Sequence, residues 1–134
     1  METFQHLMSG FAVALSPLNL LFATIGCILG TLIGVLPGLG PAAGTALLIP
    51  ITFKLDPTAA IIMLAGIYYG AMYGGTITSV LVNVPGEAAS VVTCLDGYEM
   101  AKQGRAGAAL GIAAIGSFIG GSAATLGLVV MALP

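Results

Sequence analysis

Long apolar runs, separated by short polar turns, fill almost the whole chain. Leu18–Leu36 is 19 residues without a charge, close to the ~20 that a helix needs to cross a bilayer. A second apolar helix is predicted from Pro57 to about Gly74, and a last one over Ala106–Leu133. The pattern predicts an all-α, polytopic integral membrane protein.

The first 17 residues carry a different pattern. From Phe4 to Phe11, large apolar side chains recur every three to four positions, which places them on one face of a helix. A helix with one apolar face lies in the membrane interface rather than across the membrane. We therefore expect an interfacial segment at residues 1–17 and a transmembrane domain at residues 18–134.

Proline and glycine interrupt the apolar sequence at two places, Leu36–Gly38 and Val84–Gly86. Proline removes a backbone donor and blocks helix continuation, while glycine permits the turns that a broken helix needs. The second break divides Thr76–Leu95, which we expect to be a segment separate from the helix before it. Paired interruptions of this kind are the best sequence indication of a transporter binding site, and they predict re-entrant or interrupted helices.

The breaks suit an anionic solute. A half-helix that begins within the membrane leaves backbone N–H groups unpaired and presents about half a positive charge, so it can hold a carboxylate without a buried Arg or Lys. The alternative is a pair of kinks with a packing role, with Ser and Thr bonded to their own helices. The predicted substrate-binding residues are Pro37, Gly38, Leu39, Gly40, Thr45, Ser79, Asn83, Pro85 and Gly86.

Glu87 is the only carboxylate inside an apolar stretch. An ionisable group at membrane depth is a functional candidate, so Glu87 and the adjacent Asn83 are candidates for coupling transport to Na⁺ or H⁺. The alternative is a first-turn Glu that complements its own helix dipole. No other cofactor and no metal site is predicted.

Glycines at four-residue spacing predict close helix packing in a membrane. Two seams at this spacing are expected, the first with Gly26, Gly30 and Gly34 and the second with Gly66, Gly70 and Gly74. A third glycine seam, in which Gly107, Gly111, Gly116 and Gly120 keep one face small, is expected over Ala106–Leu133.

Helix ends are marked by local residues. Asp56 followed by Pro57 is a helix start, Asp96 with Glu99 resembles a capping box, and Gly104 is a helix stop. Tyr69 and Tyr73 share a helix face. Either hydroxyl is a candidate to bind a solute, and the alternative is that these tyrosines anchor the helix at the membrane interface.

Composition limits the function classes. The 134 residues are 58% hydrophobic and 6% charged, with three basic residues and a net charge of −2, so nucleic acid is not a partner. No catalytic motif is present, and the chain is not expected to be an enzyme. Because basic residues beside spans tend to be cytoplasmic, placing Lys54, Lys102 and Arg105 on that side makes Pro57–Leu95 one excursion out and back.

Four motifs, in this order, resemble the large membrane subunit of tripartite tricarboxylate transporters, the TctA family. They are PGLGPAAG, AGIYYGAMYGG, NVPGEAAS and LDGYEMAKQGRAG. The resemblance covers about residues 30–121 and implies an N-terminal portion, hence a fragment, of a longer permease of the bacterial inner membrane.

The resemblance further implies a secondary transporter that takes up tricarboxylate- or dicarboxylate-type organic anions. Its partners would be a small membrane subunit, a periplasmic solute-binding protein, the lipid bilayer and the organic anion itself. Two other functions stay open from the residues alone. One is a non-transporting structural or assembly fragment of such a complex, and the other is a channel-like pore.

Overall fold

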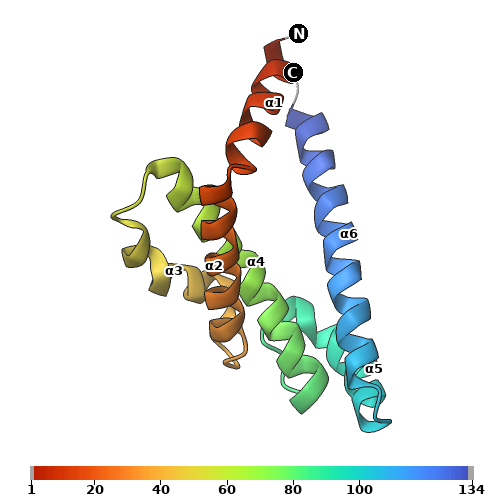
Figure 1. Ribbon diagram of the computed structural model, residues 1–134. Coiled ribbons are helices and arrows are strands. Elements are labelled where there is room, and N and C mark those ends of the chain that lie inside the picture. Colours follow the sequence, from red (N-terminus) through yellow and green to blue (C-terminus); the bar gives the residue numbers. More distant parts are fainter. Residues whose placement is uncertain (1, 133–134) are drawn as a thin grey trace.

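The structure, a computed structural model, describes residues 2–132, and these fold into helices joined by short loops without a strand (Figure 1). The predicted all-α class is confirmed. In chain order the elements are α1 (Glu2–Ala14), α2 (Pro17–Gly34), α3 (Gly40–Thr52), α4 (Pro57–Val82), the 3₁₀ turn η1 (Ala88–Ser90), α5 (Val91–Lys102) and α6 (Ala106–Ala132).

Three helices are long and apolar enough to cross a membrane: α2, α4 and α6. At ~1.5 Å per residue their 18, 26 and 27 residues correspond to ~27, ~39 and ~40 Å. The hydrocarbon core of a bilayer is ~30 Å thick. The chain is therefore a multi-pass membrane protein, in which α3 is a shorter apolar helix between two spans.

Helices α2 and α4 form the closest contact in the molecule, and they run in the same direction. Gly26 faces Met63, and Gly30 faces Ile67, with a constant difference of 37 in residue number. A Cβ added to any glycine of the two predicted seams would lie 2.6 Å or less from a carbonyl oxygen of the other helix. The first two glycine seams are thus confirmed as backbone-to-backbone contacts.

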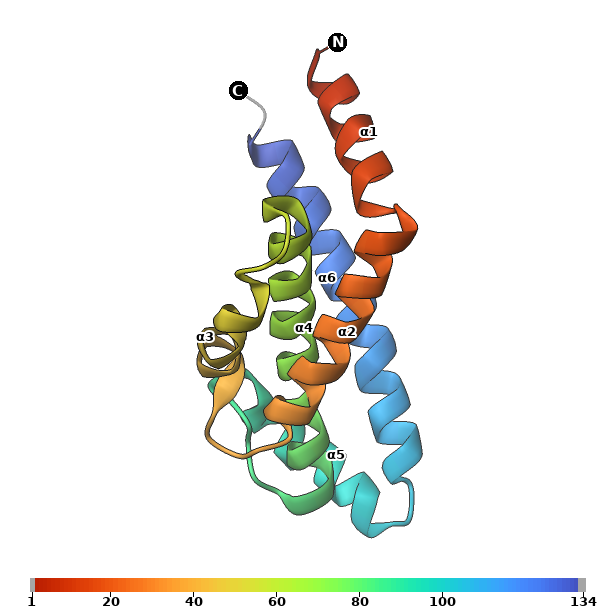
Figure 2. The ribbon, with the colours of Figure 1, turned by 60° about the vertical axis from the view of Figure 1, so that its left-hand side comes forward.

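Because α2 and α4 are parallel, α3 must carry the chain back to the level at which α2 began. It packs against both helices through a small core in which Leu48, Met63 and Ile67 are buried. Gly34–Phe53 therefore returns along α2 and α4, as Figure 2 shows at the side of the bundle.

The expected helix end near Gly74 is wrong. Helix α4 continues through Gly74 and Gly75 to Val82. A glycine in a helix interior costs about 1 kcal/mol, which close packing can offset. The break at Asn83–Gly86 is confirmed, since α4 ends at Val82 and the next turn begins at Ala88.

Local end signals were partly correct. The Asp56 carboxylate accepts a hydrogen bond from the Thr58 N–H at 3.1 Å, as predicted for a helix start. Gly104 stops α5 with φ +77°, and the Arg105 N–H donates to the Met100 carbonyl at 2.9 Å, a Schellman arrangement. The Asp96–Glu99 capping box is wrong, because α5 begins at Val91.

The three basic residues lie at two ends of the molecule. Lys54 comes just before α4, whereas Lys102 and Arg105 follow the other end of α4, where α5 packs Gly97 against Val80. Figure 1 shows the α5–α6 turn at the far end from the start of α4. Pro57–Leu95 is therefore not one excursion between two basic flanks on one side.

The third glycine seam is also wrong as a single face. Each residue turns a helix by about 100°, so the five-residue step from Gly111 to Gly116 moves the stripe to the other side of α6. Among the described residues, none lies within 4 Å of a Cβ placed at any glycine of α6. The interfacial role of residues 1–17 stays a prediction. There α1 ends before Pro17, and the Asn19 side chain donates to the Val13 carbonyl at 2.8 Å.

Candidate functional site

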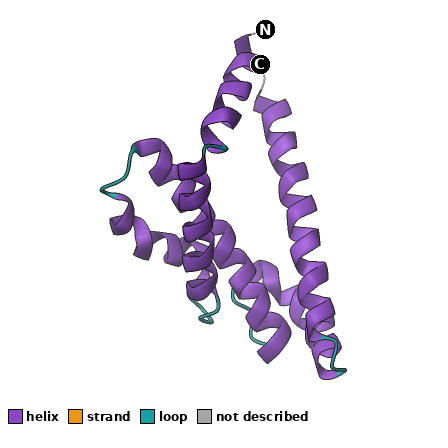
Figure 3. Cartoon of the chain, in the orientation of Figure 1, coloured by secondary structure: helices purple, strands orange, loops and turns teal. Residues whose placement is uncertain are grey.

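The two Pro-Gly breaks lie beside neighbouring residues of α4, Gly74 and Gly75. A Cβ on Gly74 would lie 2.8 Å from the Cα of Gly34, the last residue before the first break. A Cβ on Gly75 would lie 3.3 Å from the Cα of Gly86, in the second break. The loops lie side by side in two views (Figures 2 and 3). Helices α2 and α4 thus bring together two breaks 48 residues apart (86 − 38).

The first break is an exposed turn of glycine-dependent backbone. Gly38 has φ +87° and Gly40 has φ +60°, and the residues from Pro37 to Leu39 are exposed. Helix α3 begins immediately afterwards, with Pro41 in its first turn. The N–H groups that α3 leaves free therefore belong to residues next to the turn.

The second break reverses the chain against α4. Asn83 ends α4 in the left-handed conformation, with φ +58°, and its side chain is exposed. Gly86 is buried, because it lies directly on Gly75. The Ser90 hydroxyl then accepts from the Glu87 N–H at 3.2 Å and donates to the Glu87 carbonyl at 2.9 Å, which closes the first turn of the returning helix.

Each break is therefore followed by a helix N-terminus, α3 after the first and η1–α5 after the second. Such ends carry unpaired N–H groups and partial positive charge. These groups belong to Gly40 and Ala42 after the first break, and to Ala88 and Ala89 after the second. Sequence reasoning included Gly40 but missed the three alanines, which are exposed, although their place in the first turn after each break was the available signal.

Glu87 stands at the start of the second of these helix ends. It lies in the loop between α4 and α5, outside the three spanning helices, and is half-buried. Desolvation by this burial raises the pKa of its carboxyl above the ordinary value, because burial disfavours the charged form. This carboxyl therefore holds a proton more readily than a fully exposed Glu would, and it lies directly after the second break.

The hydroxyl groups predicted as secondary ligands bond within their own helices. Thr45 donates to the Pro41 carbonyl at 2.7 Å, and Ser79 donates to the Gly75 carbonyl at 2.8 Å. Ser79 is completely buried, so its hydroxyl is not presented to a solute. Thr78 also bonds back to Gly75, at 3.0 Å. These residues shape α4 and α3 rather than the exposed surface of the breaks.

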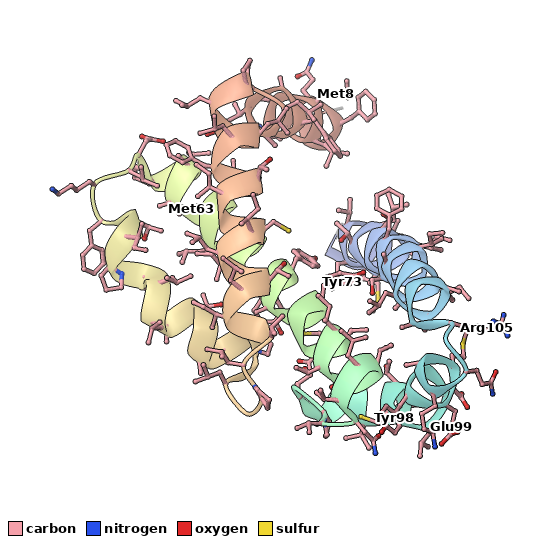
Figure 4. The ribbon with its side chains drawn as sticks, turned by 60° about the horizontal axis from the view of Figure 1, so that its bottom comes forward. Met8, Met63, Tyr73, Tyr98, Glu99 and Arg105 are labelled. Atoms are coloured by element: carbon pink, nitrogen blue, oxygen red, sulfur yellow. The ribbon has the colours of Figure 1, made fainter. Side chains whose placement is uncertain are left out.

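Two cavities lie away from the two breaks. A groove of about 670 Å³ runs between α1, α4 and α6, and its lining includes Tyr69 and Tyr73. The Tyr73 hydroxyl donates to the Leu110 carbonyl of α6 at 3.2 Å, and Figure 4 shows Tyr73 pointing from α4 toward α6. A smaller cavity of about 270 Å³ between α4, α5 and α6 contains Asp96. Within residues 2–132, no three His, Cys, Asp or Glu side chains are grouped to hold a metal ion.

Comparison with known proteins identifies the family of this chain. The family model "Tripartite tricarboxylate transporter TctA family" matches residues 20–134. An uncharacterised 52.8 kDa protein in the TAR-I ttuC′ 3′ region of Agrobacterium vitis is 54% identical over all 134 residues, and the chain spans 27% of its length. No solved structure matches. With most of its length covered by the family model, the chain belongs to the tripartite tricarboxylate transporter TctA family.

Proposed function

We propose that this chain forms part of a permease that moves tricarboxylate- or dicarboxylate-type organic anions into the cell. The permease would be a secondary transporter of the bacterial inner membrane, driven by a Na⁺ or H⁺ gradient. A periplasmic binding protein would deliver the solute, and a small membrane subunit would complete the tripartite complex. The observation that carries the proposal is the approach of two broken segments to neighbouring residues of α4, Gly74 and Gly75, in a chain of this family.

The proposed contact is made by backbone rather than by basic side chains. The turns Pro37–Gly40 and Asn83–Gly86 lead into the N-termini of α3 and of η1–α5, and free N–H groups at such ends bind carboxylates. Lys and Arg are absent from residues 2–53 and 55–101, so the helix ends supply the positive potential near the breaks. Asn83 is exposed and adds an amide donor within the second turn.

Ion coupling is proposed at Glu87 and Asn83. Glu87 lies directly after the second break, and desolvation raises the pKa of its carboxyl. Protonation would remove a negative charge from the place where the anion binds, which links solute and proton. With Na⁺ as the coupling ion, the Glu87 carboxylate and the Asn83 carbonyl oxygen would be ligands of the hard-oxygen type that such cations prefer.

The test uses a full-length chimera, in which this chain replaces the matched segment of the Agrobacterium vitis relative. Citrate and succinate should raise the thermal stability of the purified chimera, since a ligand stabilises the state that binds it. Gly38→Ala strains a backbone with φ +87°, and Asn83→Gly removes the amide but keeps the left-handed turn. We expect each to weaken citrate binding at least about tenfold, which is ~1.4 kcal/mol.

Gly111→Ala is the matched control, because the new Cβ on α6 meets no described atom within 4 Å. It should leave citrate binding unchanged, and all three variants should insert into membranes in equal amounts. Unchanged citrate affinity in both break variants would overturn the site. A chimera that neither citrate nor succinate stabilises would overturn the function and leave an assembly role for the chain.

A further inference from the structure

A groove of about 670 Å³ lies between α1, α4 and α6, and the proposed carboxylate site does not use it. Phe11 of α1 lies at one wall, with Tyr69 and Tyr73 of α4 at the other. The face of α6 between Ala114 and Leu126 completes it, and we call this face the groove face of α6. Figure 1 shows α6 standing apart from α2 and α4 along this part of its length.

Helix α6 is held only near its beginning. Ala109 is buried, and the Leu110 carbonyl accepts the hydrogen bond of Tyr73. Beyond that point the apolar side chains are open, with Phe118 75% and Leu126 67% exposed, and none of residues 111–131 is buried. A 27-residue helix with this exposure has room for another partner along its second half.

The chemistry of the groove face favours a helix as that partner. Its middle consists of small or hydroxyl-bearing residues, Ser117, Gly121, Ser122 and Thr125. In a bilayer, small residues let two helix backbones approach closely, and Ser and Thr form hydrogen bonds across the contact. An acyl chain offers no partner to the exposed hydroxyls of Ser117 and Ser122. The α2–α4 contact shows that this chain packs helices through small residues.

The source of the helix follows from the length of the relative. All 134 residues match 27% of the Agrobacterium vitis protein, which leaves 73% (100 − 27) of that polypeptide outside the matched segment. We propose that a transmembrane helix from this outside part docks in the groove, against the groove face of α6 and opposite Tyr69 and Tyr73. The proposal is independent of carboxylate binding at the breaks.

The test places a photo-crosslinking residue in the groove of the chimera. Phe118 replaced by p-benzoyl-phenylalanine keeps an aromatic ring at the groove, and the same replacement at Ile119 is the matched control. Ile119 is 61% exposed and does not line the groove. After irradiation in membranes, mass spectrometry of the digested chimera identifies the attached peptide.

The expected product at position 118 joins α6 to an apolar segment from outside the matched 134 residues, at a yield several times that at position 119. Products with lipid alone would show that lipid fills the groove. Products between two copies of the chimera, or with α1 or α4 alone, would assign the groove to self-association or to internal closure. Each of these three results would overturn the proposal.

A substitution gives a second measurement that does not depend on crosslinking. Gly121→Leu adds a side chain to the groove face at a position where a Cβ meets no described atom within 4 Å. We expect the 134-residue chain alone to keep its thermal stability, whereas the chimera loses stability because the docked helix is displaced. Equal effects in the two proteins would contradict a docked helix.

Discussion

Single residues set the geometry of the two breaks. Gly38 and Gly40 adopt positive φ, and Asn83 does so without being glycine. Asn tolerates the left-handed conformation better than most residues, and here it ends α4 while leaving its amide exposed. Proline explains why each helix stops, but the positive φ values explain how the chain turns into the next helix.

Glu87 gives a prediction about pH. Because desolvation raises the pKa of its carboxyl, Glu87 takes up a proton as pH falls from neutrality through that raised value. The protonated group no longer repels an anion, so citrate binding to the chimera should tighten over this range. Above it, the ionised carboxylate opposes the anion and binding should be weaker. Isothermal titration at a series of pH values between about 4.3, the ordinary pKa of Glu, and about 7.5 checks this.

The Glu87→Gln variant distinguishes the pH dependence that comes from Glu87 from the pH dependence that comes from the solute. Gln cannot titrate, so the pH dependence that the variant keeps comes from citrate and from other groups, and the difference between parent and variant comes from Glu87. We expect the variant to bind citrate with the tighter, protonated-like affinity at pH 7.5, by a factor of several over the parent. The same pH profile for parent and variant would rule out a role for Glu87.

Helix pairs differ sharply in how they use glycine. In α2 and α4 the glycines face the backbone of the other helix, with Gly66 near the Ala23 carbonyl and Gly74 near Gly34. In α6 the glycines meet nothing among the described residues. Gly107 and Gly111 keep the four-residue spacing of the α2 and α4 glycines but lie on an open surface, so spacing alone does not show whether a helix partner is present.

This difference predicts opposite effects of one substitution. Gly30→Ala places a Cβ into the Ile67 carbonyl, and such overpacking costs typically 1–3 kcal/mol. Gly111→Ala in α6 should be neutral or stabilising by up to ~1 kcal/mol, because alanine favours a helix. Unfolding of the 134-residue chain in mixed micelles, followed by circular dichroism, measures both. Similar stabilities for the two variants would contradict the parallel α2–α4 contact.

The packing of the helices determines at which ends of the molecule the chain termini and the basic residues lie, and the distribution of charges in the sequence does not predict this. Glu2 of α1 and Ala132 of α6 lie toward the same end of the molecule (Figure 1). Lys54 precedes the first residue of α4, while Arg105 follows α5, on the same side of the bundle as Tyr98 and Glu99 (Figure 4). Since α4 is ~39 Å long, the two groups of basic residues are separated by about the thickness of a bilayer.

The topology can be checked by labelling from each side. In a variant with Cys27 and Cys94 replaced by alanine, Lys54→Cys and Gln103→Cys should react with an impermeant maleimide from opposite sides of sealed vesicles. Both flanking residues are exposed and lie at the two ends of the α4–α5 unit. Labelling of both cysteines from one side would contradict this topology and support the expectation that Pro57–Leu95 crosses the membrane out and back between basic residues on one side.

By itself, the sequence determined the helical membrane class, the α2 and α6 spans and the places of both breaks. Apolar runs, Pro-Gly pairs and the Asp56–Pro57 start are local signals, which act through hydration and backbone sterics within a few residues. They fail where a contact outweighs local preference. Gly74–Gly75 resembled a helix end, yet packing against Gly34 and Gly86 keeps α4 continuous.

Only the tertiary structure decided which segments meet. Local sequence patterns do not show in which direction one helix runs along another. The parallel pairing of α2 with α4, the return of α3 and the burial of Ser79 could therefore not be deduced from them. The convergence of the breaks depends on a constant offset of 37 residues between two helices. That offset is fixed by the joint fit of two glycine faces, because closest approach is possible only where both backbones are bare.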